Sequence, residues 1–70
     1  MLYEIRVRGR LGDTVLQSFG GFEGSVEETE TVLRGPIRDQ ARLHEVLEQV
    51  ESFGLELLEV RRLEPPPRRR

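Results

Sequence analysis

Residues 35–62, GPIRDQARLHEVLEQVESFGLELLEVRR, decide the fold, because this one stretch predicts a helix, a turn and a strand in succession. Its apolar side chains recur every three or four positions, which places them on one stripe of a helix. These residues are Leu43, Val46, Leu47, Val50 and Phe53. Asp39 is predicted to cap the first turn through its carboxylate, and Gly54 to end the helix in the left-handed conformation.

After the glycine the apolar period changes from about 3.6 residues to 2, which predicts a strand with one covered face. Leu58 and Val60 are predicted to face the covered side. The opposite side is predicted to carry Leu57, Glu59 and Arg61.

The rest of the chain is predicted to supply the remaining strands of a sheet. Alternating apolar and polar residues predict strands over residues 2–11, 22–28 and 31–37, and Asp13 is predicted to cap a short helix over residues 13–19. The order β-α-β-β-α-β predicts an α+β fold of the ferredoxin-like, split β-α-β type, in which a short first helix and a long second helix cover one face of a four-stranded antiparallel sheet. A ββαβ arrangement is the alternative if residues 13–19 form a loop.

The chain length limits the domain organisation. The 70 residues predict one α+β domain over residues 1–63, followed by a disordered tail rich in Pro and Arg over residues 64–70. The tail, EPPPRRR, could be a polyproline ligand, a basic hook for an acidic surface or simply solvated chain. Because so short a chain buries only a small core, we expect a second subunit to complete it as a homodimer.

The composition argues against several classes of function. The net charge of −2 at pH 7 disfavours nucleic-acid binding, which depends on excess positive charge. The absence of cysteine excludes disulfides, thiolate metal sites and cysteine nucleophiles. No apolar run approaches the ~18 residues of a membrane span, so we expect a cytoplasmic protein without a membrane partner.

Two runs of the sequence resemble a known family. The run LRGPIRDQARLHEVL, followed by GLELLEVRR, is similar to the pattern of a family of small uncharacterised bacterial proteins. The resemblance extends from Tyr3 to about Leu63. It implies no activity and no functional residues.

The candidate catalytic and metal-binding residues are few. His44 is the single histidine, and Glu48, one helical turn further on, could hydrogen-bond to it as part of an acid–base pair. A histidine packed at the boundary of the core explains the same position without chemistry, and one histidine without cysteine does not make a zinc site. The acidic turn of Glu27, Glu28 and Glu30 could hold a hard cation, but a solvated hairpin tip is the simpler interpretation. No catalytic, metal or cofactor site is therefore predicted, and we expect the protein not to be an enzyme.

The outward face of the predicted sheet carries an unusual concentration of arginine. If the two central strands are the first and the third, one face carries Arg6, Arg8, Arg34 and Arg61. Like charges on neighbouring strands repel each other, so something is expected to compensate them.

Three compensating arrangements are possible. In the first, carboxylates pair across the strands, with Glu23 and Glu27 beside Arg34, and Glu4 and Glu59 beside the arginines of the first strand. In the second, a partner subunit's sheet covers the face, and the apolar contacts are Val32, Leu57 and Leu63. In the third, the arginine forks hold an anionic ligand.

These observations predict a non-enzymatic protein–protein interaction or oligomerisation module, homodimeric through its sheet. The possible interface or anion-binding residues are Arg6, Arg8, Arg34 and Arg61. The partner would be a second copy or another protein. The alternative function is that of a binding or sensor domain for a small anionic metabolite, held by the same arginines.

Overall fold

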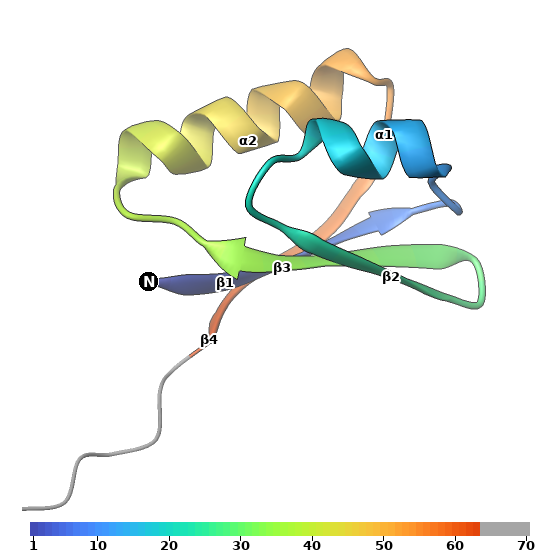
Figure 1. Ribbon diagram of the computed structural model, residues 1–70, viewed down its shortest axis with the longest axis horizontal. Coiled ribbons are helices and arrows are strands. Elements are labelled where there is room, and N and C mark those ends of the chain that lie inside the picture. The colour runs from blue at the N-terminus through green and yellow to red at the C-terminus, as the bar shows by residue number, and fades with distance from the viewer. Residues whose placement is uncertain (64–70) are drawn as a thin grey trace, which may run out of the picture.

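The computed structural model of the protein describes residues 1–63 and has two helices packed on one face of a four-stranded sheet (Figure 1). The elements follow each other as β1 (Leu2–Arg8), α1 (Asp13–Ser18), β2 (Glu23–Glu27), β3 (Glu30–Pro36), α2 (Gln40–Ser52) and β4 (Leu57–Leu63). The strand order is β2-β3-β1-β4, with every neighbouring pair antiparallel. The ferredoxin-like prediction is confirmed, and because α1 is present the ββαβ alternative is not. The tail predicted over residues 64–70 lies outside the described residues.

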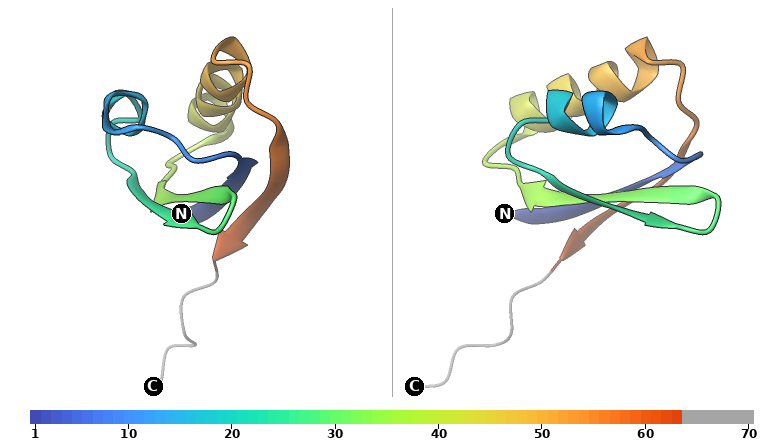
Figure 2. Two further views of the ribbon diagram at one scale, coloured as in Figure 1. Left: turned by 90° about the vertical axis from the view of Figure 1, so that its right-hand side faces the viewer. Right: turned by 45° about the vertical axis from the view of Figure 1, so that its right-hand side comes forward.

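The core lies between the helices and the sheet. Seven buried apolar side chains form it, namely Ile5, Val7, Phe19, Leu33, Ile37, Val46 and Val50. Figure 2 shows α1 over the half of the sheet that contains β2, and α2 over the half that contains β4. Each helix therefore covers about half of the sheet, and the side of α2 that faces β4 closes the core beside a free sheet edge.

The predicted stripe of α2 is confirmed except at its last residue. Val46 and Val50 are buried, and Leu43 and Leu47 pack against the core. Phe53 is 43% exposed, because the helix ends at Ser52 and the ring lies beyond it, with its centroid 5.8 Å from that of the Phe19 ring.

The ends of the helices confirm two of the three predicted caps. The Arg42 backbone N–H donates to Asp39 Oδ1 at 2.9 Å, and Gly54 has a positive φ of 72° just beyond α2. At α1 the prediction was wrong, because Gly12 occupies the N-cap position and its carbonyl accepts from the Leu16 N–H at 3.0 Å. Asp13 is instead the first residue of the helix, where its negative charge is favourable next to the free N–H groups.

The hairpin between β2 and β3 contains the one non-glycine residue with positive φ among residues 1–63. Glu28 has a φ of 56° in the turn between the paired residues Glu27 and Glu30. We expect Glu28→Gly to raise the free energy of unfolding by about 0.5–1 kcal/mol, because glycine adopts this conformation without a steric penalty. Urea denaturation followed by circular dichroism would measure the change.

Removing a negative charge from the same acidic turn could also stabilise it, and Glu28→Gln controls for that effect. The glutamine variant keeps the positive φ strained while it loses the charge. A gain in the glutamine variant as large as in the glycine variant would contradict the backbone explanation.

The strand β4 contains a register shift that the alternating pattern did not predict. Pairing with β1 is regular from Leu63 to Glu59, which lies opposite Arg6, and then skips one residue so that Leu57 lies opposite Val7. Such a bulge places the residue before it on the opposite face from the one that strict alternation predicts. Leu57 was predicted to face outward, and this prediction was wrong because the bulge turns it toward α2.

Among residues 1–63 no helix is long and apolar enough to cross a membrane. The cytoplasmic location stays a prediction.

Candidate functional site

The outer face of the sheet carries a network of ion pairs around one buried carboxylate. Glu4, on the central strand β1, lies opposite Arg34 on β3 and Arg61 on β4. Glu4 Oε1 accepts a hydrogen bond from Arg34 Nε at 2.9 Å, and Glu4 Oε2 lies 3.4 Å from Arg6 Nη2 and 3.9 Å from Arg61 Nη2. The side chain of Glu4 is only 5% exposed. Three arginines from three strands therefore surround a single negative charge.

Arg6 joins this network to the hairpin. Its Nη1 donates to Glu30 Oε1 at 2.9 Å and to Glu27 Oε1 at 3.2 Å, and its Nε lies 3.9 Å from Glu59 Oε1. Arg8 stands apart and pairs with Glu56 at 2.9 Å in a largely exposed position. All four arginines singled out in the sequence thus have carboxylate partners within their own chain.

These contacts hold the network in its ionised form. The hydrogen bond from Arg34 is the largest influence on Glu4 and lowers its pKa, and the positive charges of Arg34, Arg61 and Arg6 add to this effect while burial opposes it. Hydrogen bonds to Glu30 and Glu27 raise the pKa of Arg6. The outer face is therefore a charge-balanced surface rather than a free cationic patch.

Cross-strand pairing was one of the three predicted arrangements, and the contacts support it with changed partners. Glu4 and Glu59 pair with Arg6 as predicted. Arg34 pairs with Glu4 rather than with the carboxylates of β2, and Glu27 pairs with Arg6 instead. These changes occur because Glu4 projects from the central strand, where it is within reach of both neighbouring strands.

The three apolar contacts predicted for a covering subunit do not form one surface. Leu57 is turned toward α2, and Val32, although it lies opposite the outward-facing Arg6, is 0% exposed. Leu63 pairs with Leu2 at the end of the sheet. The three predicted contacts therefore do not make one continuous apolar patch on the outer face.

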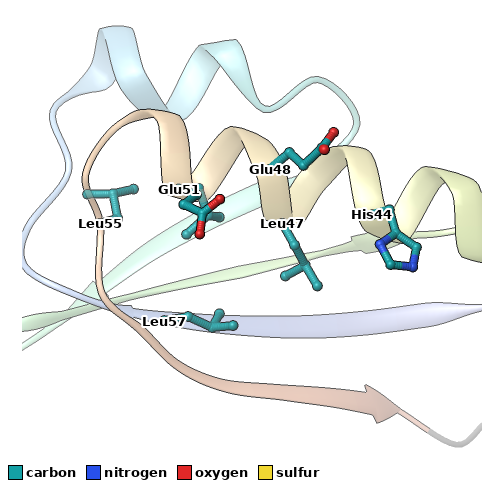
Figure 3. A pocket seen from close by; sticks show the side chains of 7 residues that line it. His44, Leu47, Glu48, Glu51, Leu55 and Leu57 are labelled. Atoms are coloured by element: carbon teal, nitrogen blue, oxygen red, sulfur yellow. The ribbon is translucent and has the colours of Figure 1, made fainter.

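A groove of about 310 Å³ lies between α2 and the start of β4. Its apolar side chains come from Leu47, Val50, Leu55 and Leu57. Figure 3 shows Leu47 directed from α2 toward Leu57, while Glu48 is directed away from the gap. Leu57 is 42% exposed here, so the groove presents leucine surface to solvent directly beside the free edge of β4.

His44 lies at the rim of this groove on an exposed turn of α2. Glu48 also lines the groove, but among the described residues no hydrogen bond joins the two side chains. The acid–base pair considered from their spacing is therefore not formed in this structure.

The acidic turn does not form a cation site. Arg6 lies within hydrogen-bonding distance of both Glu27 and Glu30, so its guanidinium neutralises the carboxylates that a cation would need. Within residues 1–63 no group of three or more His, Cys, Asp or Glu side chains is placed to hold a metal ion.

Sequence reasoning did not predict the groove. It missed the groove because strict alternation assigned Leu57 to the outer face. The available signal was the pair Leu57–Leu58, since two adjacent leucines at the start of a strand interrupt the alternation.

The comparisons with known proteins give a family without a function. The family model of a domain of unknown function, DUF8691, matches residues 2–61. No curated protein and no solved structure matches the chain.

Proposed function

Because the chain belongs to the DUF8691 family, whose name assigns no activity, we propose its function from the geometry of the fold. The protein is a non-enzymatic association module that pairs with a second copy along the open edge of β4. The observation that carries this proposal is the leucine-lined groove that lies directly beside that edge. An edge strand presents unpaired backbone N–H and C=O groups, and a neighbouring apolar groove accepts side chains from the strand that pairs with it.

The proposed interface differs from the one that the arginines indicated. Arg6 and Arg34 already donate hydrogen bonds to Glu4, so a partner that used these two arginines would first have to displace a buried carboxylate. Leaving a buried charge without its partner is costly. The same argument disfavours an anionic metabolite on these side chains. The edge of β4 requires no such displacement.

The function is tested by the solution mass of the full chain. Light scattering from about 10 µM to about 1 mM is expected to show a mass rising from 8.1 kDa toward twice that value. Leu57→Asp is expected to weaken the association at least tenfold, because it places a charge in the apolar groove.

Val26→Asp is the matched control. Val26 is 40% exposed, against 42% for Leu57, and it lies on β2 at the opposite edge of the sheet. The control variant should associate as the unmodified chain does. A mass that stays at 8.1 kDa over the whole concentration range would refute the proposed function.

A further inference from the structure

The pairing of β1 with its two neighbours determines which backbone groups of β4 face the open edge. The Ile37 N–H donates to the Met1 carbonyl, so the odd-numbered residues of β1 direct their backbone groups toward β3. The even-numbered residues therefore face β4, as the bond from Arg8 N–H to the Glu56 carbonyl illustrates. Residues of β4 opposite those even positions, such as Glu59 and Arg61, direct their backbone N–H and C=O groups toward β1. Val60, between them, directs its N–H and C=O toward the open edge.

A second copy that pairs with this edge antiparallel is related by a twofold axis, and the residue on the axis lies opposite itself. In such pairs, residues that lie opposite each other project from the same face of the sheet. The regular part of β4 offers three central positions for the axis, at Glu59, Val60 or Arg61. Each position gives a different set of facing charges.

Only one of the three positions brings opposite charges together. An axis at Glu59 places two carboxylates face to face, and an axis at Arg61 places two guanidinium groups face to face. An axis at Val60 places Glu59 opposite the partner's Arg61, and the symmetry repeats this pair.

The two side chains are available for this contact. Glu59 is 48% exposed and Arg61 is 59% exposed. Each reaches a charge of its own chain only at 3.9 Å, Glu59 at Arg6 and Arg61 at Glu4. These long contacts leave both side chains able to turn toward a neighbouring strand.

We propose that two copies pair β4 to β4 about a twofold axis at Val60, with Glu59 of each copy facing the partner's Arg61. The inference rests on the proposed function and specifies its register. The two sheets join into one continuous sheet, and each groove between α2 and β4 lies beside the C-terminal end of the partner's β4. The paired charges select this register against its neighbours, and β4 is no longer an exposed edge.

The test is a charge exchange between two variants of the full chain. In a homodimer of the Glu59→Arg variant, two arginines face each other at positions 59 and 61. In a homodimer of the Arg61→Glu variant, two glutamates face each other at the same positions. Each variant alone is therefore expected to dimerise at least tenfold more weakly than the unmodified chain. In a heterodimer of the two variants, the arginine at position 59 of one copy faces the glutamate at position 61 of the other. The second pair consists of the unmodified Arg61 of the first copy and the unmodified Glu59 of the second. The mixture is therefore expected to regain the dimer, which native mass spectrometry would identify as the heterodimer of the two variants.

Glu56→Arg is the matched control. Glu56 pairs with Arg8, precedes the bulge and lies outside the proposed register, so the variant reverses a charge on the same segment without changing the facing pairs. It should dimerise as the unmodified chain does, and thermal melts should show that every variant is folded. If the unmodified chain dimerises and the two single variants keep its affinity, or if their mixture fails to regain the dimer, the register is wrong while the association itself stands. If the unmodified chain is monomeric, the proposed function fails with it.

Discussion

Gly35→Ala is expected to lower the free energy of unfolding by about 2–3 kcal/mol, in the range found for overpacked cores. A Cβ built at Gly35 would lie 2.6 Å from the carbonyl oxygen of Gly21 and 2.8 Å from the ring of Phe22. Because the closest contact is with backbone, the connection between α1 and β2 would have to move away from β3. Thermal unfolding followed by circular dichroism should show a fall in Tm of about 10–20 °C.

Two other glycines separate the steric effect from the general cost of replacing glycine. A Cβ at Gly20 would meet nothing within 4 Å, so Gly20→Ala should leave the stability unchanged or raise it slightly. A Cβ at Gly24 would lie 2.5 Å from Leu16 Cδ2, the flexible end of a side chain that can rotate away, so Gly24→Ala should cost less than Gly35→Ala. Equal losses at Gly24 and Gly35 would contradict the argument that the rigid backbone contact dominates.

The parts of the fold that the sequence predicted are those that depend on local interactions. The helix α2, its cap at Asp39 and its end at Gly54 depend on residues within a few positions of one another. The central position of the first and third strands could also be predicted from the sequence, because four alternating segments and two helices in this order leave few compact arrangements.

The parts that the sequence did not predict depend on residues far apart in the chain. The bulge at Leu57 arises from pairing with Val7, fifty positions earlier, and no pattern within β4 specifies where that pairing shifts. The burial of Glu4 has the same origin. Alternation assigned it to the solvated face, but side chains from β1, β3 and β4 converge on it and exclude water.

The fold pairs the arginines of the outer face with carboxylates of the same chain. Several arginines on one predicted face of a sheet suggest a site for an anion or a partner, because the sequence alone does not show which carboxylates lie opposite those arginines. In the fold these positive charges form ion pairs with carboxylates of the same chain, namely Glu4, Glu27, Glu30 and Glu56. Exposed leucine surface lies elsewhere, at the groove beside β4.

Glu4→Gln is expected to destabilise the fold by about 1.5–3 kcal/mol at pH 7, the usual contribution of hydrogen bonds to charged groups. Glutamine keeps the size of the side chain and an oxygen that can accept from Arg34 Nε. It removes the negative charge, however, so the repulsion among Arg6, Arg34 and Arg61 is no longer offset by the carboxylate that lies between them. The matched control is Glu56→Gln, which removes a carboxylate from an exposed pair with Arg8 and should cost at most about 1 kcal/mol.

The pH dependence distinguishes the charge of Glu4 from its shape. The pKa of Glu4 is lowered in the folded protein, chiefly by the hydrogen bond from Arg34, so the folded state favours the ionised carboxylate more than the unfolded chain does. Its contribution to stability is therefore fully present above the unfolded pKa of about 4.3 and is lost as the pH falls through the lower pKa of the folded state. Urea denaturation from pH 7 to about pH 2 should show the unmodified chain losing its advantage over Glu4→Gln across this acidic interval. A difference between the two proteins that stayed constant down to the lowest pH would mean that the glutamine acts through packing, and that the ionised carboxylate does not hold the three arginines together.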